Sequence, residues 1–128
     1  MSQVAVDSPN WTFISDLFLR VRIEGLARGA AIVLRNFTEP AALLAALATG
    51  AAPRLVVLDL HARDDAAFTL LAALAARADA PPTLGFHSHV DEAIRERALA
   101  AGCTRVVPRS AIMNRFAALV AEAPGART

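Results

Sequence analysis

Short apolar runs alternate along the chain with longer segments in which apolar residues recur at helical spacing. The clearest run is residues 55–58, Leu-Val-Val-Leu, which is entered through Pro53 and followed by Asp59. Consecutive branched apolar residues over this length are typical of a parallel strand that is buried on both faces. We therefore predict a central strand over residues 54–60, with a carboxylate at its carboxyl end.

Further runs of this kind and the helical patterns between them predict the remaining elements. The other predicted strands are residues 11–14, 31–34, 83–88 and 105–107. The predicted helices cover residues 17–28, 41–48, 66–77, 92–101 and 111–123. Strands that alternate with helices at short intervals favour right-handed crossovers. The sequence therefore predicts one α/β domain over residues 1–128, with its core in residues 10–123 and a doubly wound, five-stranded parallel sheet with five helices.

The first predicted helix is assigned a buried side and a wet side from its pattern. Phe18, Val21 and Leu26 lie near helical spacing and are expected on the buried side. Arginine and glutamate at positions 20, 22 and 24 are expected to face water.

Polar residues follow several of the predicted strands. Asp16 follows the first strand, Asp59 the third, His87 and Ser88 end the fourth, and Arg109 follows the fifth. Because the carboxyl ends of parallel strands meet at one edge of the sheet, these side chains are expected on a common rim, where such sheets bind ligands.

Composition narrows the function classes. The 13 basic residues are all arginine and are balanced by 12 acidic residues, without a basic stripe that would indicate nucleic acid or anionic lipid. The absence of lysine excludes lysine-dependent chemistry. The single Cys103 is interpreted as a packed residue, and no apolar stretch approaches the roughly 18 residues of a membrane span. We expect a cytoplasmic protein without a nucleic-acid or membrane partner.

Two segments carry a resemblance to a known family. Residues 55–60, Leu-Val-Val-Leu-Asp-Leu, and residues 101–109, Ala-Gly-Cys-Thr-Arg-Val-Val-Pro-Arg, resemble the receiver domain of two-component response regulators, as does the order of elements over nearly the whole chain. The resemblance implies the flavodoxin-like strand order 2-1-3-4-5. It also implies that Asp59 is the phosphoacceptor and that Asp16 and Asp59 are the candidate ligands of Mg²⁺, the one cofactor it suggests.

The chain departs from the family pattern at the other positions of the site. Ser15 replaces one acidic residue, and His87, followed by Ser88, stands at the position of the phosphate-binding hydroxyl. Arg109 replaces the lysine, and Val106 replaces the aromatic residue that reports phosphorylation. Arginine is a planar fork and not a point charge, so this exchange is not conservative. We expect Arg109 to lie directly against Asp59.

The histidines leave several readings open. His61 and His89 fall at positions that tune the lifetime of the phosphate in the family. Imidazole with carboxylate also suits a transition metal, so a metal site built from rim residues is an alternative. Its candidate ligands are Asp16, Asp59, His61, His87 and His89.

The preferred function is a stand-alone receiver-like signalling module, not an enzyme, in which phosphorylation of Asp59 is impaired or absent. Its expected partners are a histidine kinase, a downstream signalling protein or a second copy, bound through the fourth helix, fifth strand and fifth helix. The apolar residues expected at that surface are Ile94, Leu99, Val106, Met113 and Phe116. The alternatives are a working phosphoacceptor with Mg²⁺ and a small metal-binding protein or enzyme.

Overall fold

A computed structural model of the chain describes residues 10–50, 53–88 and 91–124. In these residues the strands pair in parallel in the order β2-β1-β3-β4-β5, so the predicted doubly wound sheet is confirmed. The strands are β1 (Asn10–Phe13), β2 (Leu34–Phe37), β3 (Val56–Asp59), β4 (Thr83–His87) and β5 (Arg105–Pro108). The helices are α2 (Leu17–Gly29), α3 (Pro40–Ala48), α4 (Ala66–Ala75), α5 (Glu92–Ala100) and α6 (Arg109–Ala121), with a short 3-10 turn, η1 (Arg63–Asp65).

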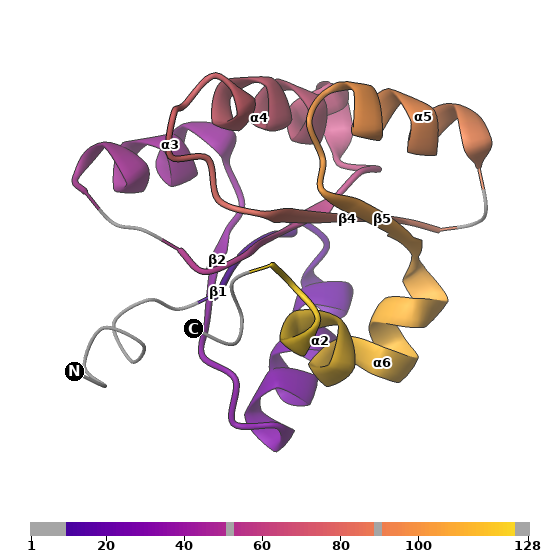
Figure 1. Ribbon diagram of the computed structural model, residues 1–128. Helices are drawn as coiled ribbons and strands as arrows, with labels where there is room; N and C mark the ends of the chain where they lie inside the picture. Colours follow the sequence, from indigo (N-terminus) through magenta and orange to yellow (C-terminus); the bar gives the residue numbers. More distant parts are fainter. Residues whose placement is uncertain (1–9, 51–52, 89–90, 125–128) are drawn as a thin grey trace.

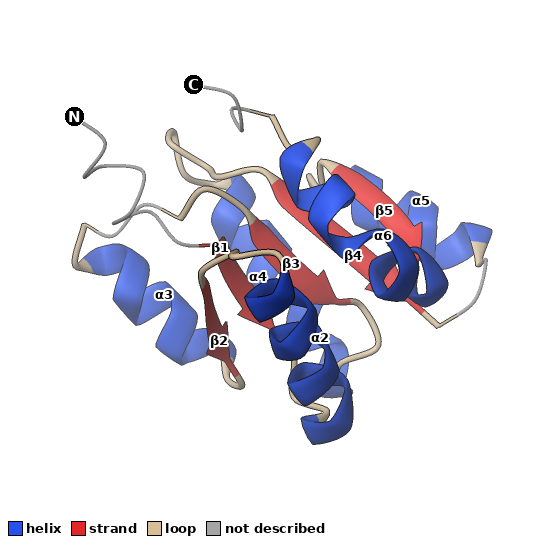
Figure 2. Ribbon diagram, turned by 90° about the horizontal axis from the view of Figure 1, so that it is seen from below, coloured by secondary structure: helices blue, strands red, loops and turns tan. Residues whose placement is uncertain are grey.

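The helices cover the sheet in two layers. α3, α4 and α5 lie on one face, at the top of Figure 1, and α2 and α6 lie on the other. Figure 2, seen from below, shows α2 and α6 in front of the strands. This arrangement follows from strands that are apolar on both sides and need covering on both.

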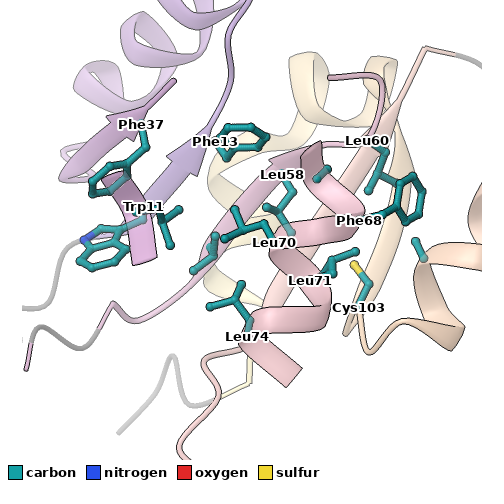
Figure 3. Packing of buried hydrophobic residues seen from close by; sticks show 14 of the residues in the cluster. Trp11, Phe13, Phe37, Leu58, Leu60, Phe68, Leu70, Leu71, Leu74 and Cys103 are labelled. Carbon is teal, nitrogen blue, oxygen red and sulfur yellow. The ribbon is translucent and has the colours of Figure 1, made fainter. Parts of the chain in front are cut away.

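Each layer has its own buried cluster. On the α3–α5 side, Leu70, Leu71 and Leu74 of α4 pack on Leu58 of the central strand (Figure 3). On the α2–α6 side, Val57 of the same strand packs with residues of both helices. Burial of this apolar surface on both sides is the main term that holds the sheet in place.

The second strand begins later than the sequence predicts. Residues 31–34 were predicted as a buried strand, but β2 is Leu34–Phe37 and only Phe37 of it is fully buried. Ala31 has a left-handed backbone, φ 57°, which turns the chain away from α2. The β1 register then pairs Asn10 with Leu34, which leaves Val33 outside the sheet and 56% exposed. The prediction was wrong because an edge strand needs few buried positions.

The buried side of α2 also differs from the prediction. Leu19, Ile23 and Ala27 face the sheet. Phe18 is 83% exposed and Val21 51% exposed. The assignment of Phe18, Val21 and Leu26 to the buried side was therefore wrong, because a second stripe one residue along the helix is the one that packs.

Among the described residues, no helix combines the length and the apolar composition that crossing a bilayer requires.

Candidate functional site

Asp59 is the last residue of β3 and is buried, with 6% of its surface exposed. Side chains alternate along a strand, and Val57 packs in the cluster between α2 and α6. Asp59 therefore faces the same side, toward the first residues of these two helices. That position puts its carboxyl between Asp16, which precedes α2, and Arg109, which begins α6.

The surroundings of Asp59 raise the pKa of its carboxyl above the ordinary value. Burial is the largest cause, because removal from water disfavours the charged form. The main-chain N–H of His61, which donates to Oδ1 at 2.9 Å, lowers the pKa, as do the charges of Arg109 and His61. The charge of Asp16 raises it. Burial prevails, so the protonated carboxyl persists to a higher pH than in water.

Asp16 is committed to the start of α2. Its Oδ1 accepts a hydrogen bond from the main-chain N–H of Leu19 at 3.0 Å, which is an N-cap interaction. The carboxylate is near enough to influence Asp59, as the rim position predicted. One of its oxygens, however, is already occupied by the helix.

Arg109 does not contact Asp59. No ion pair joins the two side chains within the described residues, although the guanidinium charge does act on Asp59. The expected direct pair is therefore wrong. The Nε atom of Arg109 is buried and has no hydrogen-bond partner among the described side chains and main-chain groups. The fork of arginine differs in length and shape from an ammonium group, so an arginine at this position does not reproduce the contacts of a lysine.

His87 and Ser88 lie on different sides of the rim. Leu84 and Phe86 of β4 pack toward α2 and α6, so alternation turns His87 toward the opposite face, where it is buried. Ser88 is exposed, and its Oγ forms a hydrogen bond with Nε2 of His61 at 3.3 Å. The hydroxyl of Ser88 thus joins the loop after β4 to the loop after β3, beside Asp59.

The donor set does not fit the predicted metal sites. Across the three described ranges, no group of three or more histidine, cysteine or acidic side chains is placed to hold a metal ion. For Mg²⁺ the rim offers two carboxylates, one of which caps α2, and Ser15 is exposed where the family has another acid. His89, predicted as a further ligand and tuning residue, lies outside the described residues. The described residues therefore do not support the five-ligand transition-metal site, and magnesium binding by Asp16 and Asp59 stays a prediction.

A cavity of about 430 Å³ opens at the same end of the sheet, between the β1 end, the start of α3 and the turn η1. Ser15, Thr38, Glu39, Arg63 and Asp64 supply its polar lining. Of the described rim residues, Asp59, His61 and His87 do not line it. Ser15, which stands where the family pattern has an acidic residue, lines this cavity and directly precedes Asp16 of the rim.

The surface predicted for partner binding is not apolar. Val106 and Phe116 are buried in the core, with 9% and 3% of their surface exposed. Ile94 and Met113 are partly buried against it, and only Leu99 is an exposed large apolar residue. Val106 and Phe116 were predicted to supply interface contacts and instead hold the sheet. Sequence reasoning missed the exposed residues of α2, although the stripe at positions 19, 23 and 27 was a signal for them.

Comparisons with solved structures agree with this architecture. A response regulator receiver protein from Burkholderia phymatum is 23% identical, with a TM-score of 0.73, over 91% of this chain and 98% of its own. A response regulator from Hahella chejuensis is 17% identical, with a TM-score of 0.78, over 89% and 92%. The Mn²⁺-bound form of response regulator Rcp1 is 14% identical, with a TM-score of 0.71, over 88% of each chain. No model of a protein family and no curated protein matches the sequence. The chain has the fold of response regulator receiver domains.

Proposed function

We propose that the protein is a receiver-like signalling module that acts by protein–protein interaction, with phosphorylation of Asp59 impaired or absent. The observation that carries the proposal is the state of Asp59: its carboxyl is buried, held by the His61 N–H, and not in contact with Arg109. A cytoplasmic location and a kinase or downstream protein as partner remain predictions.

Attack on a phosphoryl group requires the carboxylate form of Asp59. Burial raises the pKa of this carboxyl, so the charged form that attacks is less favoured than it would be in water. Negative charge on a transferred phosphoryl group also requires donors that already point at it. The Ser88 hydroxyl is engaged with His61, and the guanidinium of Arg109 is not in contact with the acceptor. Both features oppose the phosphoryl transfer that receiver domains perform.

The test is incubation of the purified chain with labelled acetyl phosphate and Mg²⁺, with label and intact mass measured over time. The expected result is no stoichiometric label. Stoichiometric label that is lost in Asp59→Asn and kept in Asp64→Asn, an exposed acid in the next loop, would overturn the proposal.

A gain-of-function variant tests the cause. His87→Thr combined with Arg109→Lys and Ser15→Asp restores the residue types of the family at three positions. If the exchanged neighbours impair the reaction, this variant takes up label on Asp59 and the triple variant with Asp59→Asn does not. Label on neither would leave the buried carboxyl itself as the cause.

A working phosphoacceptor is the second candidate, because one observation favours it. Asp16, Asp59 and Arg109 are near enough for both charges to act on the acceptor. The acetyl phosphate experiment separates the two candidates directly.

A further inference from the structure

α2 exposes an unusual amount of apolar surface. Of the six large apolar side chains that are exposed in the described residues, four belong to α2: Leu17, Phe18, Val21 and Leu26. Phe18 is the most exposed of all, at 83%. Exposed large apolar side chains gathered on one element mark a candidate binding surface. Figure 2 shows α2 beside α6 in the layer in front of the strands.

The outward face of α2 changes from bulky to small along its length. Phe18, Val21, Gly25 and Arg28 follow one another at the spacing of a single helical stripe, opposite the buried Leu19, Ile23 and Ala27. A side chain at Gly25 would meet only the Arg28 guanidinium, at 3.8 Å, and one at Gly29 would meet nothing within 4 Å. The first half of the stripe therefore protrudes, whereas Gly25 leaves a low point that is bordered by the Arg28 side chain.

The backbone of α2 does not require glycine at position 25 or 29. Gly25, in the interior of α2, costs about 1 kcal/mol of helix stability relative to alanine. Neither glycine has a positive φ, and the space above each accepts a side chain. Their presence on an exposed helix is explained if another helix approaches the backbone closely there.

We propose that this stripe is a docking surface for a second copy of the same chain, with the two α2 helices antiparallel. An alignment centred near Arg22 places Phe18 of each copy over Gly25 of the other, so one contact is made twice, as a two-fold interface requires. The same alignment brings Arg28, at the carboxyl end of α2, near Asp16 of the second copy. Opposite charges and opposite ends of the helix dipoles then face each other.

This inference moves the site of self-association from the surface formed by α5, β5 and α6 to α2. On the former surface Val106 and Phe116 are buried and Leu99 is 38% exposed, whereas α2 exposes four large apolar side chains. It does not depend on whether Asp59 accepts phosphate. A protein that stays monomeric would therefore not contradict the proposed function, and phosphorylation of Asp59 would not contradict the dimer.

The first test is sedimentation across a series from micromolar to millimolar protein. The wild type is expected to form a dimer as concentration rises, and Phe18→Asp to weaken association roughly tenfold or more, as expected for loss of a central apolar contact. Gly25→Leu should weaken it as well while α2 stays helical by circular dichroism. Leu99→Asp, which changes an exposed apolar residue on α5, is the matched control and should leave association unchanged.

Arg22 distinguishes a second copy from an acidic partner. The antiparallel alignment brings the two Arg22 side chains to the same side of the interface, where they repel. Arg22→Ala should therefore tighten the dimer. An acidic partner protein would instead lose affinity with this variant.

Cross-linking tests the antiparallel direction. In a Cys103→Ser background, Phe18→Cys mixed with Gly25→Cys should form a disulfide-linked dimer with diamide faster than either variant alone. Three outcomes would overturn the proposal: a monomer at every concentration, a dimer that survives Phe18→Asp but not Leu99→Asp, or cross-linking that favours like with like.

Discussion

The helices α2 and α6 are alike in length, in position and in phenylalanine content, but they differ in how far the phenylalanine is buried. Both have 13 residues, both cover the same face of the sheet, and each contains a single phenylalanine. Phe116 of α6 is buried at 3% exposure, whereas Phe18 of α2 is 83% exposed. α6 buries Ile112, Phe116, Leu119 and Val120, and α2 buries Leu19, Ile23 and Ala27. The comparison teaches that the register of the packed stripe, and not the number of apolar residues, decides which side chains hold a fold.

The largest expected difference lies between the two phenylalanines. Phe116→Ala should lower the free energy of unfolding by about 3–5 kcal/mol, because it opens a cavity in the core. Phe18→Ala should change it by less than about 0.5 kcal/mol, because its ring already faces water. Urea unfolding followed by circular dichroism, at a protein concentration where the chain is monomeric, measures both. Equal losses would contradict the assigned register of α2.

A finer test uses two leucines within α2. Leu19→Ala should cost about 2–5 kcal/mol, since Leu19 packs between α2 and the sheet. Leu17→Ala should cost less than about 0.5 kcal/mol, since Leu17 is 55% exposed. Calorimetric melting of the two variants gives the comparison. The opposite order would restore the stripe that the sequence first suggested.

Glycine and alanine can be exchanged between the two helices. Gly25→Ala should stabilise the monomer by about 1 kcal/mol, because alanine is the better helix former and has room there. Ala118→Gly, at an exposed position of α6, should destabilise it by about the same amount. Melting temperatures at low concentration show both. A loss of monomer stability in Gly25→Ala would mean that the space above Gly25 is needed within the chain.

The smallest effect concerns Asp59, on which the starts of the two helices act with opposite charges. Asp16→Asn should lower the Asp59 pKa and Arg109→Gln should raise it. Because the folded pKa lies above the unfolded one, this carboxyl stabilises the fold below its ordinary pKa, and the contribution is lost as pH rises through the folded pKa. Arg109→Gln should therefore raise the pH at which this stabilisation is lost. It should also lower the free energy of unfolding at neutral pH by less than about 1 kcal/mol. A carboxyl ¹³C NMR titration gives the pKa of each variant, and shifts of equal sign would contradict the geometry.

The sequence predicts the architecture well where burial is two-sided. Residues 55–58 are apolar without interruption because β3 is central, and the alternation of elements then leaves few topologies. It fails at β2 and α2, where one side faces water. An edge strand with one fully buried residue, Phe37, has almost no pattern, and Ala27 is too small to mark the buried stripe of its helix.

The sequence predicted which residues lie together in the candidate site, but not which of them are in contact. Strand ends place Asp16, Asp59 and Arg109 on one rim, as expected. Whether a guanidinium touches a carboxylate depends on side-chain rotamers and on where α6 begins, and neither leaves a trace in residue spacing. Which face His87 takes became clear only from the packing of its neighbours Leu84 and Phe86 on the α2–α6 side.

The ring of Trp11 packs against Phe37 with centroids 5.0 Å apart and planes tilted by 58°, and the guanidinium of Arg35 lies over both rings. Trp11 is the only tryptophan, the chain contains no tyrosine, and the indole is 1% exposed. Its fluorescence can therefore be excited alone, and emission from so dry a site should be blue-shifted relative to the unfolded chain. Trp11 is thus a single fluorescent probe of the contact between β1 and the edge strand β2. A change in its emission would report the detachment of β2 before the rest of the sheet unfolds.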